Sequence, residues 1–340
     1  MAQQTPELVC PAGGLPALKA AVDNGADCVY LGFRDDTNAR NFNGLNFDDA
    51  ALTQGIRHAH DRGCKVLVAL NTYPQAANWS RWTAAVDRAA GHGVDAVILA
   101  DMGLMDYARR AHPQLRLHLS VQGSATSYEA INFYRQHFGI QRAVLPRVLS
   151  LAQVEQVIAN TDVEIEVFGF GGLCVMVEGR CALSAYATGV SPNCNGACSP
   201  GSAVRWEETP QGVETRVGGV LVDRFAANER AGYPTLCKGR YEVADADSAE
   251  TYYAIEEPTS LNTLELLPEL LRIGVKAIKI EGRQRSPAYV AQVTRVWRQA
   301  IDRCATDAEH FSVQGAWMAE LGKVSEGQSH TLGAYNRPWK

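Results

Sequence analysis

The stretch LVCPAGGLPALKAAVDNGADCVYLGF, residues 8–33, contains two short apolar runs separated by one amphipathic segment. The runs, 8–12 and 28–33, have the length and composition typical of buried β-strands. Between them, Leu15, Leu18 and Val22 recur at helical spacing. Two strands joined by a helix predict a βαβ unit with parallel strands, because parallel neighbours need a crossover connection.

The same alternation continues along the chain. Six further apolar runs are predicted to be strands: 65–71, 96–101, 115–122, 142–147, 163–170 and 276–282. Ser286 before Pro287 indicates the start of a last helix. Eight strands alternating with helices can close a barrel, so we expect an α/β fold of the (β/α)8 TIM-barrel type, regular or irregular. An open, doubly wound sheet is the alternative, although no GxGxxG follows any strand.

One connection is far longer than the few residues usual in such folds. It lies between the seventh and eighth strands, and it includes a predicted β-hairpin with TPQG (209–212) at its turn. An insertion after the carboxyl end of a strand lies on the face where barrel enzymes carry their active sites. We therefore expect a barrel from 1–170 and 275–304, an insertion at 171–274 and a C-terminal tail at 305–340.

The amino terminus and the composition bear on location and partners. MAQQTPELV lacks the basic and apolar regions of a signal peptide, and no apolar run approaches the roughly 20 residues of a membrane span. A cytoplasmic location and no transmembrane segment are expected. The net charge of −5 disfavours a nucleic-acid partner, which usually meets a basic face.

The nine cysteines fall into two groups. Four lie in or beside apolar runs or end a helical stripe, and we predict that they are buried as small hydrophobic residues: Cys10, Cys28, Cys64 and Cys304. The other five lie in the insertion: Cys174, Cys181, Cys194, Cys198 and Cys237. Because disulfides rarely persist in a reducing cytoplasm, the second group needs another explanation.

The spacing in the insertion is C-x6-C-x16-C-x38-C for Cys174, Cys181, Cys198 and Cys237, with Cys194 as a near neighbour. Structural zinc sites usually contain close pairs, and only Cys194 and Cys198 form one. A 4Fe–4S cluster tolerates irregular spacing, and the many nearby glycines would allow the backbone to approach a bulky cofactor. Spacing alone favours the cluster and leaves zinc and inert thiols as alternatives.

Polar side chains at strand ends are the candidates for the barrel mouth. On the fifth strand His118, Ser120 and Gln122 alternate and should share a face. The candidate catalytic residues are His118, Gln122, Lys279 and Glu281. The candidate substrate-binding residues are Arg34, Arg40, Asn71, Arg147 and Arg283, because guanidinium groups suit carboxylates. A satisfied interior histidine and a structural ion pair are the alternatives for His118 and for Lys279 with Glu281.

Three blocks of this sequence resemble the collagenase-like family once filed as peptidases of unknown catalytic type. They are 8–32, EIEVFGFGGLCVMVEGRCALSAYATG (164–189) and GVKAIKIEGRQRSPAYV (274–290), and the similarity covers about residues 7–305. The cysteine spacing is most similar to the branch that serves oxygen-independent ubiquinone biosynthesis. That resemblance implies a 4Fe–4S cluster on Cys174, Cys181, Cys198 and Cys237. It also implies a heterodimer with a UbiV-like sister subunit and hydroxylation of a polyprenylated aromatic ring, with prephenate as oxygen donor.

The sequence departs from the family pattern in places. Phe170 stands where many members have His, so a role of that His does not transfer. Cys181, Cys194 and Cys198 also fit a spacing of the sister subunit, but its first cysteine would lie near residue 40, where this chain has none. Cys194 is therefore expected to be a spare thiol.

Other functions were weighed against the hydroxylase. A peptidase is disfavoured because the chain has neither HExxH nor GxSxG. An RNA-base hydroxylase, the activity of other family branches, remains the main alternative. The hydrophobic, polyprenylated ring substrate would need a deep apolar pocket or a lipid-carrier protein that presents it.

Overall fold

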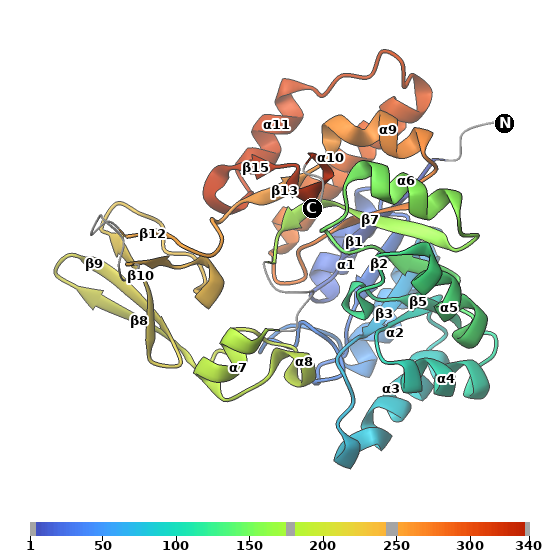
Figure 1. Ribbon diagram of the computed structural model, residues 1–340, viewed down its shortest axis with the longest axis horizontal. Coiled ribbons are helices and arrows are strands. Elements are labelled where there is room, and N and C mark those ends of the chain that lie inside the picture. The colour runs from blue at the N-terminus through green and yellow to red at the C-terminus, as the bar shows by residue number, and fades with distance from the viewer. Residues whose placement is uncertain (1–4, 175–180, 243–250, 337–340) are drawn as a thin grey trace.

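Eight parallel strands form a closed barrel in the computed structural model, which describes residues 5–174, 181–242 and 251–336 (Figure 1). Each strand pairs with the next in sequence, and β14 pairs with both β1 and β7, which closes the barrel. The strands are β1 (Glu7–Pro11), β2 (Cys28–Leu31), β3 (Lys65–Leu70), β4 (Ala96–Leu99), β5 (Arg116–Leu119), β6 (Arg142–Val144), β7 (Glu164–Gly172) and β14 (Ala277–Ile280). The predicted (β/α)8 architecture is confirmed.

Helices follow the barrel strands as the sequence predicts. They are α1 (Leu15–Asp23), α2 (Asp49–His60), α3 (Trp79–Gly91), α4 (Met102–Ala111), α5 (Tyr128–Phe138), α6 (Leu151–Ala159), α9 (Leu267–Arg272) and α10 (Pro287–Thr306). Ser286 caps α10 as expected, because its hydroxyl accepts the Tyr289 backbone N–H at 3.2 Å. Asp101, two residues after β4, likewise caps α4, because its carboxylate accepts the Leu104 backbone N–H at 2.8 Å.

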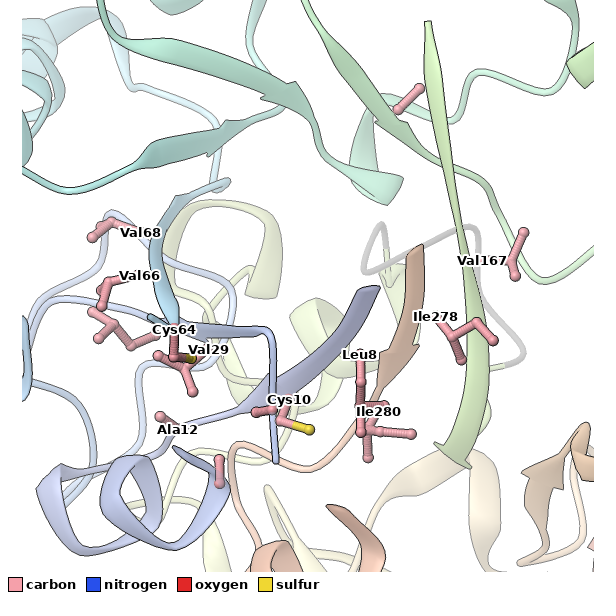
Figure 2. Close-up of a cluster of buried hydrophobic side chains, with 14 of the residues drawn as sticks. Leu8, Cys10, Ala12, Val29, Cys64, Val66, Val68, Val167, Ile278 and Ile280 are labelled. Carbon is pink, nitrogen blue, oxygen red and sulfur yellow. The ribbon is translucent and has the colours of Figure 1, made fainter. Parts of the chain in front are cut away.

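Alternate residues of the strands face opposite sides of the barrel wall. The outward side chains pack against the helices in one large apolar core; Figure 2 shows part of it, with Leu8 and Cys10 on β1 and Ile278 and Ile280 on β14. The inward apolar side chains form a separate, smaller cluster: Val9, Cys28, Tyr30, Leu67, Ala69, Ala96, Ile98 and Ala277. The four cysteines outside the insertion are all buried, as predicted.

The insertion leaves the barrel after β7 and forms its own small elements. Residues 175–180 and 243–250 of the insertion lie outside the described residues. The elements are α7 (Ala182–Thr188), α8 (Pro192–Asn195), β8 (Val204–Thr209), β9 (Gly212–Val217), β10 (Val220–Ala226), the 3-10 helix η3 (Leu236–Lys238), β11 (Arg240–Tyr241) and β12 (Tyr252–Tyr253). The predicted hairpin is β8 with β9, and β10 adds a third antiparallel strand. Figure 1 shows this sheet beside the barrel, beyond α7.

The chain then returns to the barrel and closes with a tail that packs on it. β13 (Ser260–Asn262) pairs antiparallel with the end of β7, and β15 (His330–Thr331) pairs with β13. In α11 (Gly315–Gly322), Trp317 and Leu321 are buried. The remaining 3-10 turns are η1 (Ala76–Asn78), η2 (Val121–Gly123), η4 (Leu264–Leu266), η5 (Glu326–Gln328) and η6 (Gly333–Asn336). Within the described ranges no helix is both long and apolar enough to cross a membrane.

Candidate functional site

The four predicted cluster ligands lie on four segments of the insertion. Cys174 follows the carboxyl end of β7, Cys181 precedes α7, Cys198 follows α8, and Cys237 lies in η3. Ser184 joins two of these segments: its backbone N–H donates to the Cys181 Sγ at 3.4 Å, and its hydroxyl donates to the carbonyl oxygen of Cys198. The short helix α7 therefore holds two cysteine-bearing segments together.

The thiols influence one another electrostatically. Burial raises the pKa of Cys198, the Arg40 guanidinium opposes that effect, and the charges of Cys174 and Cys181 add to it. Burial likewise raises the pKa of Cys237 to about 12, with contributions from Cys174 and Cys198. Cys198 therefore interacts electrostatically with each of the other three predicted ligands. Cys194 lies on α8, next to Asn193, whose carbonyl oxygen accepts the Tyr73 backbone N–H.

The donor set can be tested against the cofactor that the sequence suggests. Among the described residues, no group of three or more His, Cys, Asp or Glu side chains is gathered around a point that could hold a single metal ion. Four thiols would suit an iron–sulfur cluster, and ligands around such a cluster stand farther apart than ligands around one ion. Cys174, Cys181, Cys198 and Cys237 match such a cluster in number and residue type, and the cluster stays a prediction.

Arg40 connects the cysteines with the barrel mouth. Its Nη2 lies 3.8 Å from the Glu281 Oε1, and its charge acts on Cys174 and Cys198. Burial alone would raise the pKa of Glu281, but Arg40 and Arg147 lower it. The Gly172 backbone N–H donates to the Glu281 Oε2 at 3.4 Å, so Glu281 also contacts the strand that leads to Cys174.

Arg283 is a buried cation at the same end of the barrel. Its side chain lies near the Tyr30 ring, 5.6 Å from the ring centroid, and its Nη1 donates to the Asn38 Oδ1 at 3.1 Å. Among the described residues, no carboxylate lies within ion-pair distance of it, and burial lowers its pKa to about 10. A buried guanidinium with a neutral amide as partner is suited to receive an anion.

Lys279 belongs to a different set of contacts from Glu281. Its Nζ donates to the Glu166 Oε1 on β7 at 2.6 Å and lies 4.1 Å from the Tyr30 ring centroid. Glu166 is also 3.5 Å from Arg142. Lys279 and Glu281, expected to share a face, are thus separated: Lys279 points into the barrel interior, and Glu281 follows the strand end and lies at the rim.

His118 lies in the half of the barrel that contains the starts of the strands. It lines a cavity of about 90 Å³ together with residues at the starts of strands, among them Glu7, Lys65, Arg116 and Arg142. Both of its ring nitrogens are buried and have no hydrogen-bond partner among the described residues, and burial holds its pKa well below the usual range. The structure therefore places His118 away from the strand ends that carry the cysteine insertion.

The other candidates lie at the rim with different surroundings. Asn71 is buried, accepts the Ala39 backbone N–H at 3.0 Å and donates to the Ser120 hydroxyl at 3.1 Å. Gln122 lies in η2, because β5 ends at Leu119, so the expected alternation with His118 does not extend to it. Arg147 donates to the Gly172 carbonyl oxygen at 2.7 Å. Arg34, whose side chain is 57% exposed, pairs with Asp48 on the surface loop.

Several residues of the mouth and interior were missed from sequence. They are Tyr30, Asn38, Arg142, Glu166 and Glu326. The stretch EIEVF at 164–168 carried a signal, since alternate glutamates in a strand expected to be buried require partners.

The model of the family described as Peptidase family U32 matches residues 13–338. The chain belongs to this family. One relative, tRNA hydroxylation protein P1 of Bacillus subtilis (strain 168), is 31% identical over 326 residues, which are 96% of this chain and 70% of that protein. Another, tRNA hydroxylation protein P of Escherichia coli (strain K12), is 35% identical over 88% of this chain and 68% of its own length.

A third family member is named 23S rRNA 5-hydroxycytidine C2501 synthase, also from Escherichia coli (strain K12). It is 30% identical over 87% of this chain, which spans 39% of that protein. All three names refer to the modification of RNA by hydroxylation. The expectation that this chain has no nucleic-acid partner is therefore unsupported by its relatives.

Proposed function

We propose that the chain is the cluster-bearing subunit of an oxygen-independent hydroxylase, similar to UbiU of ubiquinone biosynthesis. Its substrate would be the aromatic ring of a polyprenylated ubiquinone precursor, and prephenate would donate the oxygen. The observation that carries this proposal is that Ser184 joins the segments of Cys181 and Cys198, while Cys198 interacts electrostatically with the other predicted ligands and with Arg40 at the barrel mouth. The relatives named for hydroxylation support the reaction class.

The residues of the mouth have separate roles in this proposal. The four thiolates would hold a 4Fe–4S cluster, which supplies electron transfer or activation of the donor when bound. Arg283 and Arg40 would bind the two carboxylates of prephenate, because each presents a guanidinium near the mouth and Arg283 has no carboxylate partner among the described residues. Glu281 would hold Arg40 in place until the donor arrives.

The partners follow from the same proposal. We expect activity only in a heterodimer with a UbiV-like sister subunit. The interior of the described barrel holds charged side chains such as Arg142, Glu166 and Lys279 together with the inward apolar cluster around Tyr30. We expect a lipid-carrier protein to present the polyprenylated substrate.

Iron analysis of anaerobically purified heterodimer tests the proposal. About four irons and four sulfides per chain are expected in the wild type, as for a cubane cluster. Replacement of any of Cys174, Cys181, Cys198 or Cys237 by Ala should remove the iron, whereas Cys194→Ala should keep it. A colourless protein that binds only zinc, or a cluster that persists in Cys237→Ala, would overturn the assignment.

An RNA-base hydroxylase is the second candidate, and the names of the relatives favour it. An RNA substrate would be bound through its phosphates, so its affinity would fall steeply with salt. Binding of bulk tRNA and rRNA to the heterodimer, measured between low and physiological salt, separates the two substrates. Tight, salt-dependent binding would favour RNA, and its absence would favour the ring substrate.

A further inference from the structure

The turn after α11 carries a carboxylate that reaches two distant segments. Glu326, the first residue of η5, forms ion pairs with Lys238 and with Arg285, the latter at 2.7 Å between its Oε1 and the Arg285 Nη2. Its backbone N–H donates to the Ser260 hydroxyl at 2.9 Å. The residue is therefore fixed by β13 at its main chain and by two cations at its side chain.

Two of the segments near Glu326 lead to predicted cluster ligands. Lys238 directly follows Cys237 in η3. Gly172, two residues before Cys174, lies so close that an added Cβ atom would be 2.9 Å from the Glu326 Oε1. One carboxylate from the tail thus lies against two cysteine-bearing segments that are more than sixty residues apart in sequence.

The local backbone is shaped for this placement. Gly327 has a φ of 56°, and a Cβ atom there would lie 2.0 Å from the Pro258 carbonyl oxygen. Only glycine adopts this conformation in this space without strain. The turn can therefore bring Glu326 against the insertion while β15 continues the sheet beside β13.

The ion pairs are shielded enough to matter. The side chains of Lys238 and Glu326 are 15% and 24% exposed, unlike most ion pairs on the surface of this protein. Exposed pairs contribute little to stability, whereas partly buried pairs hold their groups in one geometry. The Glu256 backbone N–H also donates to the Cys237 carbonyl oxygen at 3.1 Å, so the segment is held from both sides.

We propose that Glu326 is a positioning residue, which fastens the Cys237 segment to the end of β7 and thereby slows the loss of iron from the cluster. This inference rests on the proposed function, because it assumes that Cys237 is a ligand. The tail would in this way contribute to the cofactor site although it carries no ligand itself.

The test compares Glu326→Gln with Glu320→Gln in the anaerobic heterodimer. Glu320 is the matched control, since it is a tail carboxylate that pairs with Arg295 at 2.9 Å and forms no ion pair with the described residues of the insertion. The rate of iron transfer to a chelator should rise about five-fold in Glu326→Gln and stay unchanged in the control, as expected for a lost, partly shielded ion pair. Equal rates in the two variants would overturn the inference.

A second variant shows whether the effect passes through Lys238. Lys238→Met should also raise the rate, and the double variant should be no faster than Glu326→Gln, because Glu326→Gln already removes the ion pair with Lys238. Additive effects would contradict the proposal. If Glu326→Gln fails to fold, Lys238→Met carries the test by itself.

A measurement on the metal-free protein separates this inference from the proposed function. The rate at which iodoacetamide alkylates Cys237, followed by mass spectrometry, should rise in Glu326→Gln and not in Glu320→Gln. If the wild type binds no iron and the two variants still differ in alkylation rate, the cluster is refuted and the positioning role of Glu326 is retained. If the wild type binds iron and neither variant changes the rates of iron loss and alkylation, the positioning role is refuted and the cluster is retained.

Discussion

The buried arginines at the two ends of the barrel have different partners. At the strand starts, Arg142 lies 2.6 Å from Glu7, 2.7 Å from Glu164 and 3.5 Å from Glu166, so one guanidinium serves three carboxylates. At the mouth, Arg283 has a neutral amide as its hydrogen-bond partner. Arg40 lies 3.8 Å from its carboxylate.

This difference distinguishes charged groups that stabilise the fold from charged groups that can bind a ligand. A buried ion that is fully paired stabilises the fold that surrounds it, and removal of one partner leaves the others uncompensated. A buried cation without a carboxylate destabilises the fold and is retained where a ligand will supply the missing charge. We therefore expect the strand starts to serve as a scaffold and the mouth to bind a ligand.

The largest effect is expected at the scaffold end. Arg142→Met should lower the free energy of unfolding by about 3–5 kcal/mol, because it leaves buried carboxylates without their shared cation. Urea denaturation followed by circular dichroism measures the change. Arg116→Met is the control: its side chain is 43% exposed and pairs with Glu164 alone, so a loss below about 1 kcal/mol is expected. Equal losses would remove the distinction between the two ends.

At the mouth the same substitution should affect binding and spare the fold. Arg283→Met should change the unfolding free energy by less than about 1 kcal/mol, since a poorly paired buried ion is replaced by an apolar chain of similar volume. The Kd for prephenate should rise about 10–100-fold, the loss expected for charge-assisted hydrogen bonds. Isothermal titration of wild type and variant measures it. A collapse in stability with unchanged affinity would place Arg283 in the scaffold.

A pH titration examines His118, which belongs to the scaffold end. The pKa of its folded form lies well below 6.5, chiefly through burial and also through the charges of Arg142 and Arg116. As the pH drops below 6.5, the unfolded chain therefore gains up to one proton that the folded chain does not bind. This histidine should lower the stability by about 1 kcal/mol between pH 6.5 and 5.5, and by up to about 1.4 kcal/mol per pH unit at lower pH.

The variant His118→Leu should lose this contribution to the slope between pH 6.5 and 5.5, measured by urea denaturation at each pH. His310→Leu, at an exposed ring, should keep it. An unchanged slope in His118→Leu would mean that His118 is already protonated in the folded protein, stabilised by water or by another group.

The sequence predicted the barrel because a local signal repeats along it. All eight expected strands are present, and alternation of short apolar runs with helical stripes depends on neighbours within about 30 residues. The packing of the tail on β13 escaped prediction, since β15 has two residues and pairs far along the chain. Short elements held by distant partners leave little trace in a pattern.

The site was predictable in its residue types and less so in its contacts. Lys279 and Glu281 alternate in sequence, yet the strand ends between them, and each finds a different partner. His118 was expected near Gln122, but β5 stops at Leu119 because Ser120 begins a 3-10 turn. Strand ends decide which side chains reach the mouth, and a boundary shift of one or two residues is below what periodicity resolves.

The smallest effect sharpens the link between the mouth and the cysteines. Arg40 is the cation that acts on both Cys174 and Cys198 while it contacts Glu281. A positive charge near a cluster favours the reduced state, which carries one more electron, so Arg40→Gln should lower the reduction potential. The expected shift is about 20–40 mV, since an interaction of about 1 kcal/mol or less in a partly exposed site corresponds to that range for one electron.

Anaerobic redox titration followed by electron paramagnetic resonance measures the potential of the heterodimer. Arg34→Gln is the matched control, because Arg34 lies on the same loop and pairs with Asp48 at the surface. A shift in Arg40→Gln alone would show that the binding site and the cluster share a charge, so that a bound carboxylate would also change the potential. The same potential in both variants would separate the mouth from the cysteines, and the two would then have to be explained as independent sites.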